Sequence, residues 1–263
     1  CVDQVAEEYG HQILHSSARN EFMIERLRRI LRRTAWALQK QILAGSFRPA
    51  GYEVSFTQVA DLDAVNIALS EEEKMRLKGK IDRIDTCEKD GEVYIKVIDY
   101  KSGNKAFDLV ALYYGLQLQL VVYLNAAVEM EQRIHKEKEI IPAGIFYYHV
   151  KDPMLTGKDT ESAEEISAEL LKELKLTGLV SSDKKVYREM DQYFAGTSDV
   201  IPVAENRDGT LSKRSKAVKK EQFHTLSSFV QEKMKELGRR MLDGEIAAVP
   251  FERKTQTGCD YCI

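Results

Sequence analysis

The sequence has no long hydrophobic run, and this absence excludes one class of protein at once. No stretch approaches the roughly 18 consecutive apolar residues that a membrane-spanning helix needs, and no signal-peptide pattern opens the chain. Positive charge is not in excess either, because 39 Lys and Arg stand against 42 Asp and Glu, a net charge of −3. No global positive field therefore points to nucleic acid. We expect a cytoplasmic protein with no membrane partner.

Cysteine is also scarce. Four cysteines in 263 residues argue against a disulfide framework. Cys87 lies in a strand-like stretch and is expected to be a small buried apolar side chain. Cys259 and Cys262 form a C-x-x-C, but two ligands do not complete a metal site. A phosphate-binding G-x-x-x-x-G-K-[ST] loop is missing as well, so these residues are not expected to hydrolyse ATP.

The residues that are present suffice for one large domain. Hydrophobic residues make up 43% and charged residues 31%, which predicts a sizeable core under a polar surface. We interpret 1–263 as a single domain and, because the chain starts at Cys1 and stops just after a cysteine, as a fragment of a longer polypeptide. Hydrophobic periodicity predicts helices over 2–16, 18–45, 107–131 and 219–243.

Strand-like segments lie between these helices. Alternation predicts strands at 52–56, 77–87, 93–102 and 140–150, whereas EEEK at 71–74 is expected to be a solvated connection. The stretch 151–205 is polar and irregular with one short helix near 161–175, and we interpret 151–215 as an insertion. The expected fold is α/β, a mixed central sheet flanked by helices.

Two of these strands form a hairpin whose turn fixes the pairing. Asp90-Gly91 is a strong two-residue turn signal, so residues that face each other have numbers that sum to 181. Asp82 then faces Asp99 across the sheet, with β-carbons about 4.5–5.5 Å apart. Lys101 emerges on the same face, two residues beyond Asp99.

Two carboxylates opposite each other are unfavourable unless a positive charge lies between them or one is protonated. A divalent cation such as Mg²⁺ or Mn²⁺ suits two carboxylates plus phosphate and water. Such a site with a lysine beside it is the minimum set of groups for hydrolysing a phosphodiester. The alternative is an ordinary sheet in which Lys101 forms a salt bridge with an aspartate.

Three further residues are candidates for the same site. Glu53 could add a third carboxylate from the strand before the hairpin, or could be an exposed glutamate. Gln119 and Tyr123 are four residues apart and share one helix face with Gly115, which is equally consistent with a hydrogen-bonded pair in the core.

Several charged or titratable residues carry less information. Six arginines fall between Arg19 and Arg33, and five basic residues between Lys213 and Lys220. Such runs indicate solvated helix faces when taken alone. His11 and His15 are most simply structural, and we do not include them in the site.

Three short motifs together resemble a known family. GKIDRID at 79–85, VIDYKSG at 97–103 and QLQLVVY at 117–123 resemble the RecB-like branch of the PD-(D/E)xK nucleases. The stretch 98–127 and the C-terminal PFERKTQTGCDYC are similar to the B-subunit family (AddB or RexB) of ATP-dependent helicase–nucleases. The resemblance implies a restriction-endonuclease-like sheet with a divalent metal site.

The resemblance also implies roles for individual residues. Asp82, Asp99 and, less closely, Glu53 match metal-binding acids, and Lys101 matches the catalytic lysine. Gln119 and Tyr123 match a Q-x-x-x-Y motif beside the site that engages DNA. The Arg19–Arg33 helix becomes a plausible DNA-facing element. His11 and His15 do not match the family's metal-binding histidine, which we expect before residue 1.

The family carries a [4Fe–4S] cluster, and Cys259 and Cys262 match two of its ligands. The cluster is expected in an intact parent protein and to be incomplete in this chain. The resemblance implies DNA as substrate, an AddA-like helicase–nuclease subunit as partner, and exonuclease action on double-strand ends during recombinational repair. The alternatives are a stand-alone RecB-like nuclease of the type used in CRISPR adaptation and a non-catalytic DNA-holding module.

Overall fold

The structure is a computed structural model that describes residues 2–9, 14–56, 61–103, 106–155, 162–253 and 256–257. Its centre is a six-stranded sheet in the order β1-β4-β5-β6-β7-β8. The strands are β1 (Arg48–Ser55), β4 (Lys80–Lys89), β5 (Glu92–Lys101), β6 (Glu139–His149), β7 (Thr177–Ser181) and β8 (Ala217–Val218). The β5–β6 and β7–β8 pairs are parallel and the others antiparallel, so the expected mixed sheet is confirmed.

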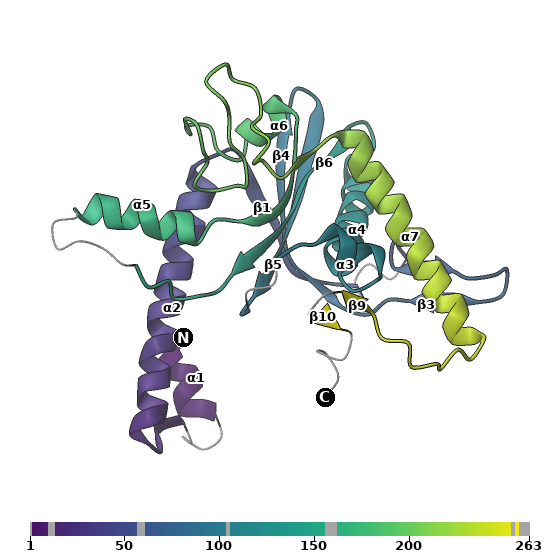
Figure 1. Cartoon of the computed structure of the whole chain (residues 1–263), viewed down its shortest axis with the longest axis horizontal. Coiled ribbons are helices and arrows are strands. Elements are labelled where there is room, and N and C mark those ends of the chain that lie inside the picture. Colours follow the sequence, from purple (N-terminus) through teal and green to yellow (C-terminus); the bar gives the residue numbers. More distant parts are fainter. Residues whose placement is uncertain are drawn as a thin grey trace.

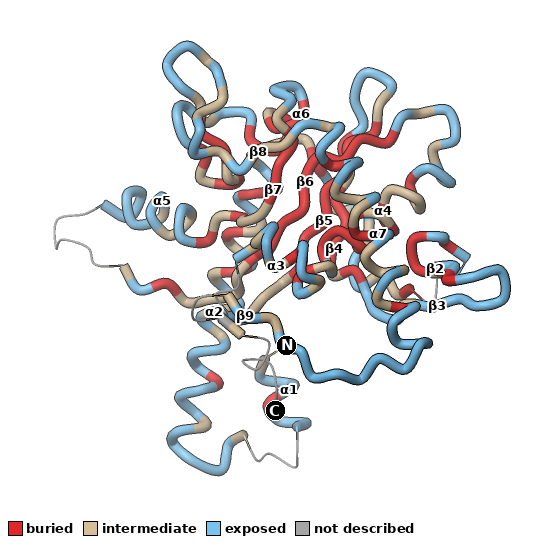
Figure 2. Tube along the Cα trace, turned by 45° about the vertical axis from the view of Figure 1, so that its right-hand side comes forward, coloured by how far each residue is buried: buried red, intermediate tan, exposed pale blue. Residues whose placement is uncertain are grey.

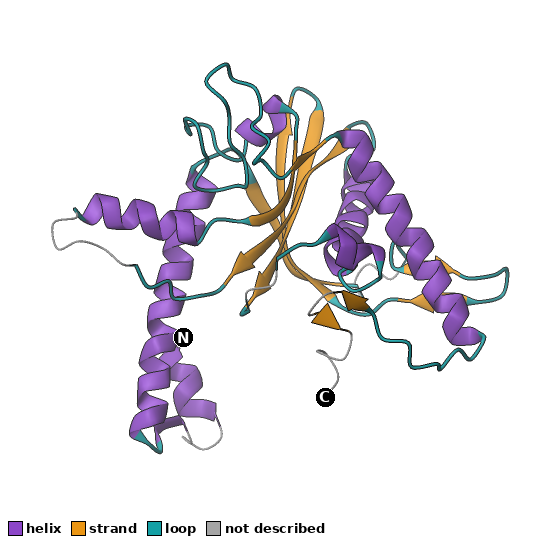
Figure 3. Cartoon of the chain, viewed as in Figure 1, coloured by secondary structure: helices purple, strands orange, loops and turns teal. Residues whose placement is uncertain are grey.

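Helices cover both faces of this sheet (Figure 1, Figure 3). One face packs against α3 (Leu109–Tyr113), α4 (Gln119–Ile134) and α7 (Lys220–Leu242). The other packs against α2 (Ala18–Leu43), α5 (Ala163–Glu173) and α6 (Lys184–Arg188), while α1 (Val2–Glu8) lies along α2. Two small ladders, β2 (Asn66–Ala68) with β3 (Lys74–Arg76) and β9 (Glu252–Arg253) with β10 (Gln256–Thr257), lie outside the sheet. No helix in the described ranges is both long and apolar enough to cross a membrane.

The central strands are buried on both faces because apolar side chains run along them almost without interruption. In β5 only the first residue and the last two are partly exposed, and in β6 only the two ends are. Figure 2 shows this buried centre as a continuous band through the middle of the sheet. Parallel pairing of β5 with β6 requires a crossover, and the chain makes it through α3 and α4. The crossover therefore returns α4 over the strand that carries Asp99 and Lys101.

The crossover corrects one expectation. The apolar stretch 107–131 was expected to be one helix, but it forms two, α3 and α4. Gly115 has a φ of +84°, the left-handed conformation that ends helices, and its N–H and that of Leu116 bond back to Leu112 and Ala111. The glycine therefore ends α3, and α4 starts afresh at Gln119.

The polar segment after β6 is more ordered than its composition indicated. The stretch 151–205 was expected to hold one short helix, and it also contains β7, which joins the central sheet, and α6. Lys74, the last residue of the expected solvated connection at 71–74, is the first residue of β3. The expected helix over 2–16 ends at Glu8, and residues 10–13 lie outside the described ranges.

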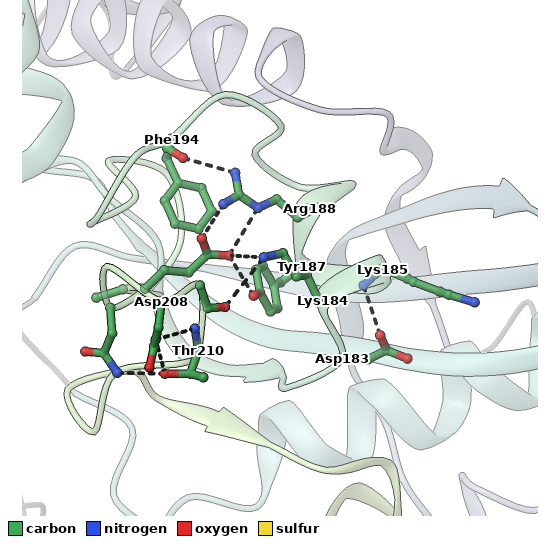
Figure 4. Close-up of polar contacts among 12 residues, drawn as sticks. Asp183, Lys184, Lys185, Tyr187, Arg188, Phe194, Asp208 and Thr210 are labelled. Atoms are coloured by element: carbon green, nitrogen blue, oxygen red, sulfur yellow. Dashed lines mark hydrogen bonds and ion pairs between the residues drawn. The ribbon is translucent and has the colours of Figure 1, made fainter.

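A network of ion pairs fixes the loops that follow α6 (Figure 4). Arg188 donates to the carboxylate of Glu205 and to the carbonyl of Phe194, whose ring lies 4.1 Å from the guanidinium. The Tyr187 hydroxyl donates to Glu205 at 2.8 Å. Burial raises the pKa of Glu205, but the bonds from Tyr187 and Arg188 outweigh it and keep that pKa low. The carboxylate stays charged and holds segments 194–205 and 184–188 together.

Gly178 is required where β7 meets β6. A β-carbon there would lie 2.1 Å from the carbonyl oxygen of Ile145, and the φ of +141° strains any other residue. We expect Gly178→Ala to lower the free energy of unfolding by about 2–4 kcal/mol, as measured by denaturant titration. Gly196→Ala is the control, because Gly196 also has a positive φ (+75°) but no atom within 4 Å of the added carbon. Equal losses in the two variants would contradict the close contact.

Candidate active site

The hairpin formed by β4 and β5 has the register that its turn dictates. Seven pairs run from Arg83↔Ile98 to Lys89↔Glu92, and the partners in each sum to 181. Asp90 and Gly91 both have positive φ, as a two-residue turn of type I′ needs. The next step after Arg83↔Ile98 places Asp82 opposite Asp99, at the point where backbone pairing between the strands stops.

Asp82 lies where the backbone pairing of β4 with β5 ends, and there its side chain forms the hydrogen bond between the two strands. Its Oδ2 accepts a hydrogen bond of 2.8 Å from the backbone N–H of Tyr100 on β5. Among the described residues, no Lys, Arg or His forms an ion pair with Asp82, whereas neighbouring acids are paired. The backbone therefore orients the carboxylate, and no side chain in the described ranges neutralises it.

Asp99 is almost fully buried, with 2% of its surface exposed, and its Oδ2 lies 2.6 Å from Nζ of Lys101. The same ammonium donates to Oε1 of Gln119 at 3.0 Å and lies 5.6 Å from the centre of the Tyr147 ring. Lys101 is thus held by a carboxylate, an amide and an aromatic face. The salt bridge considered as an alternative is present, and it is part of this arrangement.

Gln119 and Tyr123 extend the arrangement along α4. The Gln119 amide donates to the Tyr123 hydroxyl at 2.7 Å, which leaves the amide oxygen for Lys101. Burial raises the pKa of Tyr123, the bond from Gln119 lowers it, and the charges of Asp99, Asp82 and Glu53 raise it further. The pKa of Tyr147 rises to about 12, through burial and then through Asp99 and Tyr123. Both phenols therefore stay protonated near neutral pH and can act as hydrogen-bond donors.

Glu53 lies at the margin of this group. Its carboxylate is largely exposed and lies 3.2 Å from Nζ of Lys80, and its backbone has a φ of 49°, which is unusual for a residue other than glycine. In the described part of the chain no three His, Cys, Asp or Glu side chains form a ready metal-binding group. Asp82 and Asp99 supply two carboxylates for only one lysine, a donor set that suits a hard divalent cation.

The other candidate residues lie away from this site or outside the described ranges. His15 bonds to Glu21 on α2 at 2.7 Å. Cys87 is buried as expected, and burial raises the pKa of its thiol. Cys259, Cys262 and His11 lie outside the described residues.

The opposite face of the hairpin carries a buried charge cluster that the sequence analysis did not identify. Asp85 accepts two bonds from Arg83, at 2.6 and 2.7 Å, and lies 3.4 Å from Nζ of Lys96. All three are at most 4% exposed. Arg83 also donates to the Tyr100 hydroxyl at 3.5 Å, and Tyr100 is the residue whose N–H holds Asp82. The same register rule would have paired Asp85 with Lys96.

Tyr147 was also missed, because its strand reads as uniformly apolar. It pairs with Asp99 in the parallel β5–β6 ladder, a register that no local turn specifies. The ring is 1% exposed and forms the floor beneath Lys101.

Comparison with known proteins agrees with the fold. The model of the PD-(D/E)XK nuclease superfamily matches residues 1–263, and the chain belongs to this superfamily. Nucleases of this superfamily generally use divalent metal ions.

The chain is similar to proteins that are each named as the B subunit of an ATP-dependent helicase/deoxyribonuclease. It is 40% identical over 261 residues to that of Caldanaerobacter subterraneus subsp. tengcongensis, which covers 99% of this chain and 22% of the relative. It is 42% identical over 262 residues to that of Clostridium acetobutylicum, covering 100% of this chain and 22% of the relative. The chain therefore spans about a fifth of the length of the curated relatives that it matches.

Because Asp85 is buried in a charge cluster, removing its carboxylate is expected to lower the free energy of unfolding more than removing an exposed one. Asp85→Ala leaves the charges of Arg83 and Lys96 buried without their partner, so we expect a loss of about 3–5 kcal/mol in the free energy of unfolding. Glu173→Ala removes the exposed partner of Lys151 and is expected to cost less than about 1 kcal/mol. Chemical denaturation measures both variants, and similar losses would refute the role assigned to Asp85.

Proposed function

We propose that this chain is a divalent-metal-dependent deoxyribonuclease domain that hydrolyses phosphodiester bonds during the processing of double-strand DNA ends for recombinational repair. The observation that carries the proposal is the arrangement of Asp82, Asp99 and Lys101 at the open end of the β4–β5 hairpin. Membership in a nuclease superfamily supports reading this arrangement as an active site.

Asp82 and Asp99 are the residues that would hold Mg²⁺ or Mn²⁺, with Glu53 as a more distant third carboxylate. Such an ion supplies polarisation of the phosphate oxygens and a lowered pKa for a bound water. The backbone bond to Oδ2 of Asp82 orients that carboxylate, and burial keeps Asp99 in one position. Both acids are thus preorganised before any ligand arrives.

Lys101 is placed to act on the phosphate or on the attacking water. Its ammonium can stabilise negative charge that develops on the phosphate, or can orient a water by hydrogen bonding. Contacts with Asp99, Gln119 and the Tyr147 ring restrict it to one region. Gln119 is itself oriented by Tyr123, so the two residues on α4 position the lysine and can also face DNA.

The longer relatives favour a domain within a helicase–nuclease subunit over a stand-alone nuclease of the CRISPR-adaptation type. Their names combine a helicase with a deoxyribonuclease, and this chain matches only about a fifth of their length. On this view the partners are DNA and an AddA-like subunit, 151–215 is an insertion in a single nuclease domain, and Cys259 and Cys262 contribute to a [4Fe–4S] cluster in the intact protein.

The proposal predicts that cleavage depends on both aspartates. We expect Asp82→Asn and Asp99→Asn to lower the rate of Mg²⁺- or Mn²⁺-dependent DNA cleavage by about 10²–10³-fold or more. Glu53→Gln is expected to have a smaller effect, because its carboxylate is exposed and paired with Lys80. Glu137→Gln, at an exposed position on the chain after α4, is the control.

Calorimetric titration with Mn²⁺ separates this proposal from a non-catalytic DNA-holding module. Asp99-dependent binding of Mn²⁺ together with Asp99-dependent cleavage supports the nuclease. DNA binding without either property would support the holding module, and cleavage that survives both Asp→Asn substitutions would overturn the proposed site.

The position of Lys101 gives a second prediction. Gln119→Ala removes the amide that holds the ammonium, so we expect kcat for DNA cleavage to fall by about tenfold, with a smaller change in KM. Gln132→Ala, at an exposed position near the other end of α4, is the control. Steady-state kinetics measure both variants, and an unchanged kcat in Gln119→Ala would show that the amide does not position the lysine.

A further inference from the structure

A groove with a volume of about 730 Å³ lies next to the candidate active site. It is lined by residues 106–109, which lead into α3, by residues 175–179, which run into β7, and by Thr197, residues 202–204, Arg214 and Lys216. The residues that matter for its chemistry are Phe107, Asp108, Lys175, Thr177, Arg214 and Lys216. The residues that line this groove are different from those that contact Asp82, Asp99 and Lys101.

The groove begins where the candidate active site ends. Tyr147 lies beneath Lys101, and two of its neighbours line the groove: Thr177 pairs with it across β6–β7, and the Phe107 ring lies 6.5 Å from its own. Side chains in direct succession therefore connect Lys101 to the groove. A polymer with a phosphate at Lys101 could continue into it.

The charge of the groove favours an anionic occupant. Lys175, Arg214 and Lys216 line it, and Arg214 and Lys216 are exposed and form no ion pair with a described carboxylate. Lys175 donates to the carbonyl of Ser198 at 3.1 Å, which keeps its ammonium at the wall. The acid among the lining residues, Asp108, caps α3 and pairs with Arg253 at 2.9 Å. Its negative charge is thus already compensated.

The rest of the lining suits a nucleotide chain better than a lone phosphate. Phe107, which is half-buried, and Leu109, which is exposed, give the groove an apolar surface beside its cations. Aromatic and apolar surface for bases, combined with cations for phosphates, is the combination that proteins use to hold single-stranded nucleic acid. A groove of this volume falls in the range of small-ligand sites, a size that suits one strand better than a duplex.

The wall that carries the cations is fixed in place. The hydroxyl of Ser215 accepts from the N–H of Ala204 and donates to its carbonyl, both at 2.9 Å. Glu205, the residue after Ala204, accepts a hydrogen bond from Tyr187 and forms an ion pair with Arg188 (Figure 4). Arg214 and Lys216 flank Ser215, so their backbone is positioned before any ligand binds.

We propose that this groove binds the single-stranded DNA segment that adjoins the phosphodiester at Lys101, with its phosphates at Arg214 and Lys216 and a base against Phe107. The inference rests on the proposed nuclease function and deepens it. Within the run from Lys213 to Lys220, Arg214 and Lys216 then bind phosphate, whereas Lys213 is exposed outside the groove and Lys220 pairs with Glu139.

Binding of a labelled single-stranded oligonucleotide without divalent metal tests the groove apart from cleavage. We expect Arg214→Ala/Lys216→Ala to weaken binding by tenfold or more at low salt. The slope of log K against log salt should fall by about 1.4, since each lost phosphate contact on a single strand removes about 0.7. The control is Lys185→Ala/Lys213→Ala, which removes the same charge at exposed positions outside the groove.

The possible outcomes separate the groove from the nuclease. The proposed role of the groove is overturned if the test and control variants lose equal affinity for the single strand, or if the test variant loses none. It is also overturned if a blunt duplex binds as tightly as the single strand and loses as much affinity in the test variant. Cleavage that does not depend on Asp99 overturns the proposed function but leaves a groove effect on binding intact. A thermal melt checks that both double variants fold, which their exposed positions lead us to expect.

Discussion

The register of the β4–β5 hairpin is the constraint on which the rest of the site depends. A two-residue turn at Asp90-Gly91 sets it, and a slip of one residue would turn Asp82 and Asp99 toward opposite faces of the sheet. The charge cluster of Asp85, Arg83 and Lys96 reinforces the same register from the other face, since Asp85 and Lys96 face each other only in this pairing. The turn and the cluster together fix the positions of Asp82 and Asp99, and neither of these two carboxylates takes part in the turn or the cluster.

The parallel pairing of β5 with β6 is the second requirement. It obliges the chain to cross the sheet, and the crossing ends in α4, whose first residue is Gln119. A helix that began a turn earlier would carry Gln119 away from Lys101. The break at Gly115 ends α3, and α4 begins afresh at Gln119, beside Lys101.

The sequence predicts those parts of the site that local rules specify. Asp82, Asp99 and Lys101 follow from a turn type and a period of two, and the pair Gln119 and Tyr123 from a helical spacing of four. Tyr147 and the groove could not be predicted in this way, because they depend on a parallel register and on β7, which adds to the sheet from a polar segment. The single helix expected over 107–131 was wrong for a related reason: apolar periodicity continues across a glycine that ends a helix.

The wall of the groove and the carboxylate centre come from separate stretches of chain. Asp82 to Tyr147 build the centre, whereas Arg214 and Lys216 belong to a segment that closes against β7 and is held by its own ion pairs. If the groove binds DNA as proposed, changes in that segment alter which strand is bound, and how tightly, without disturbing the carboxylate centre. On the two proposals made above, substrate preference and reaction chemistry would be free to evolve independently in this fold.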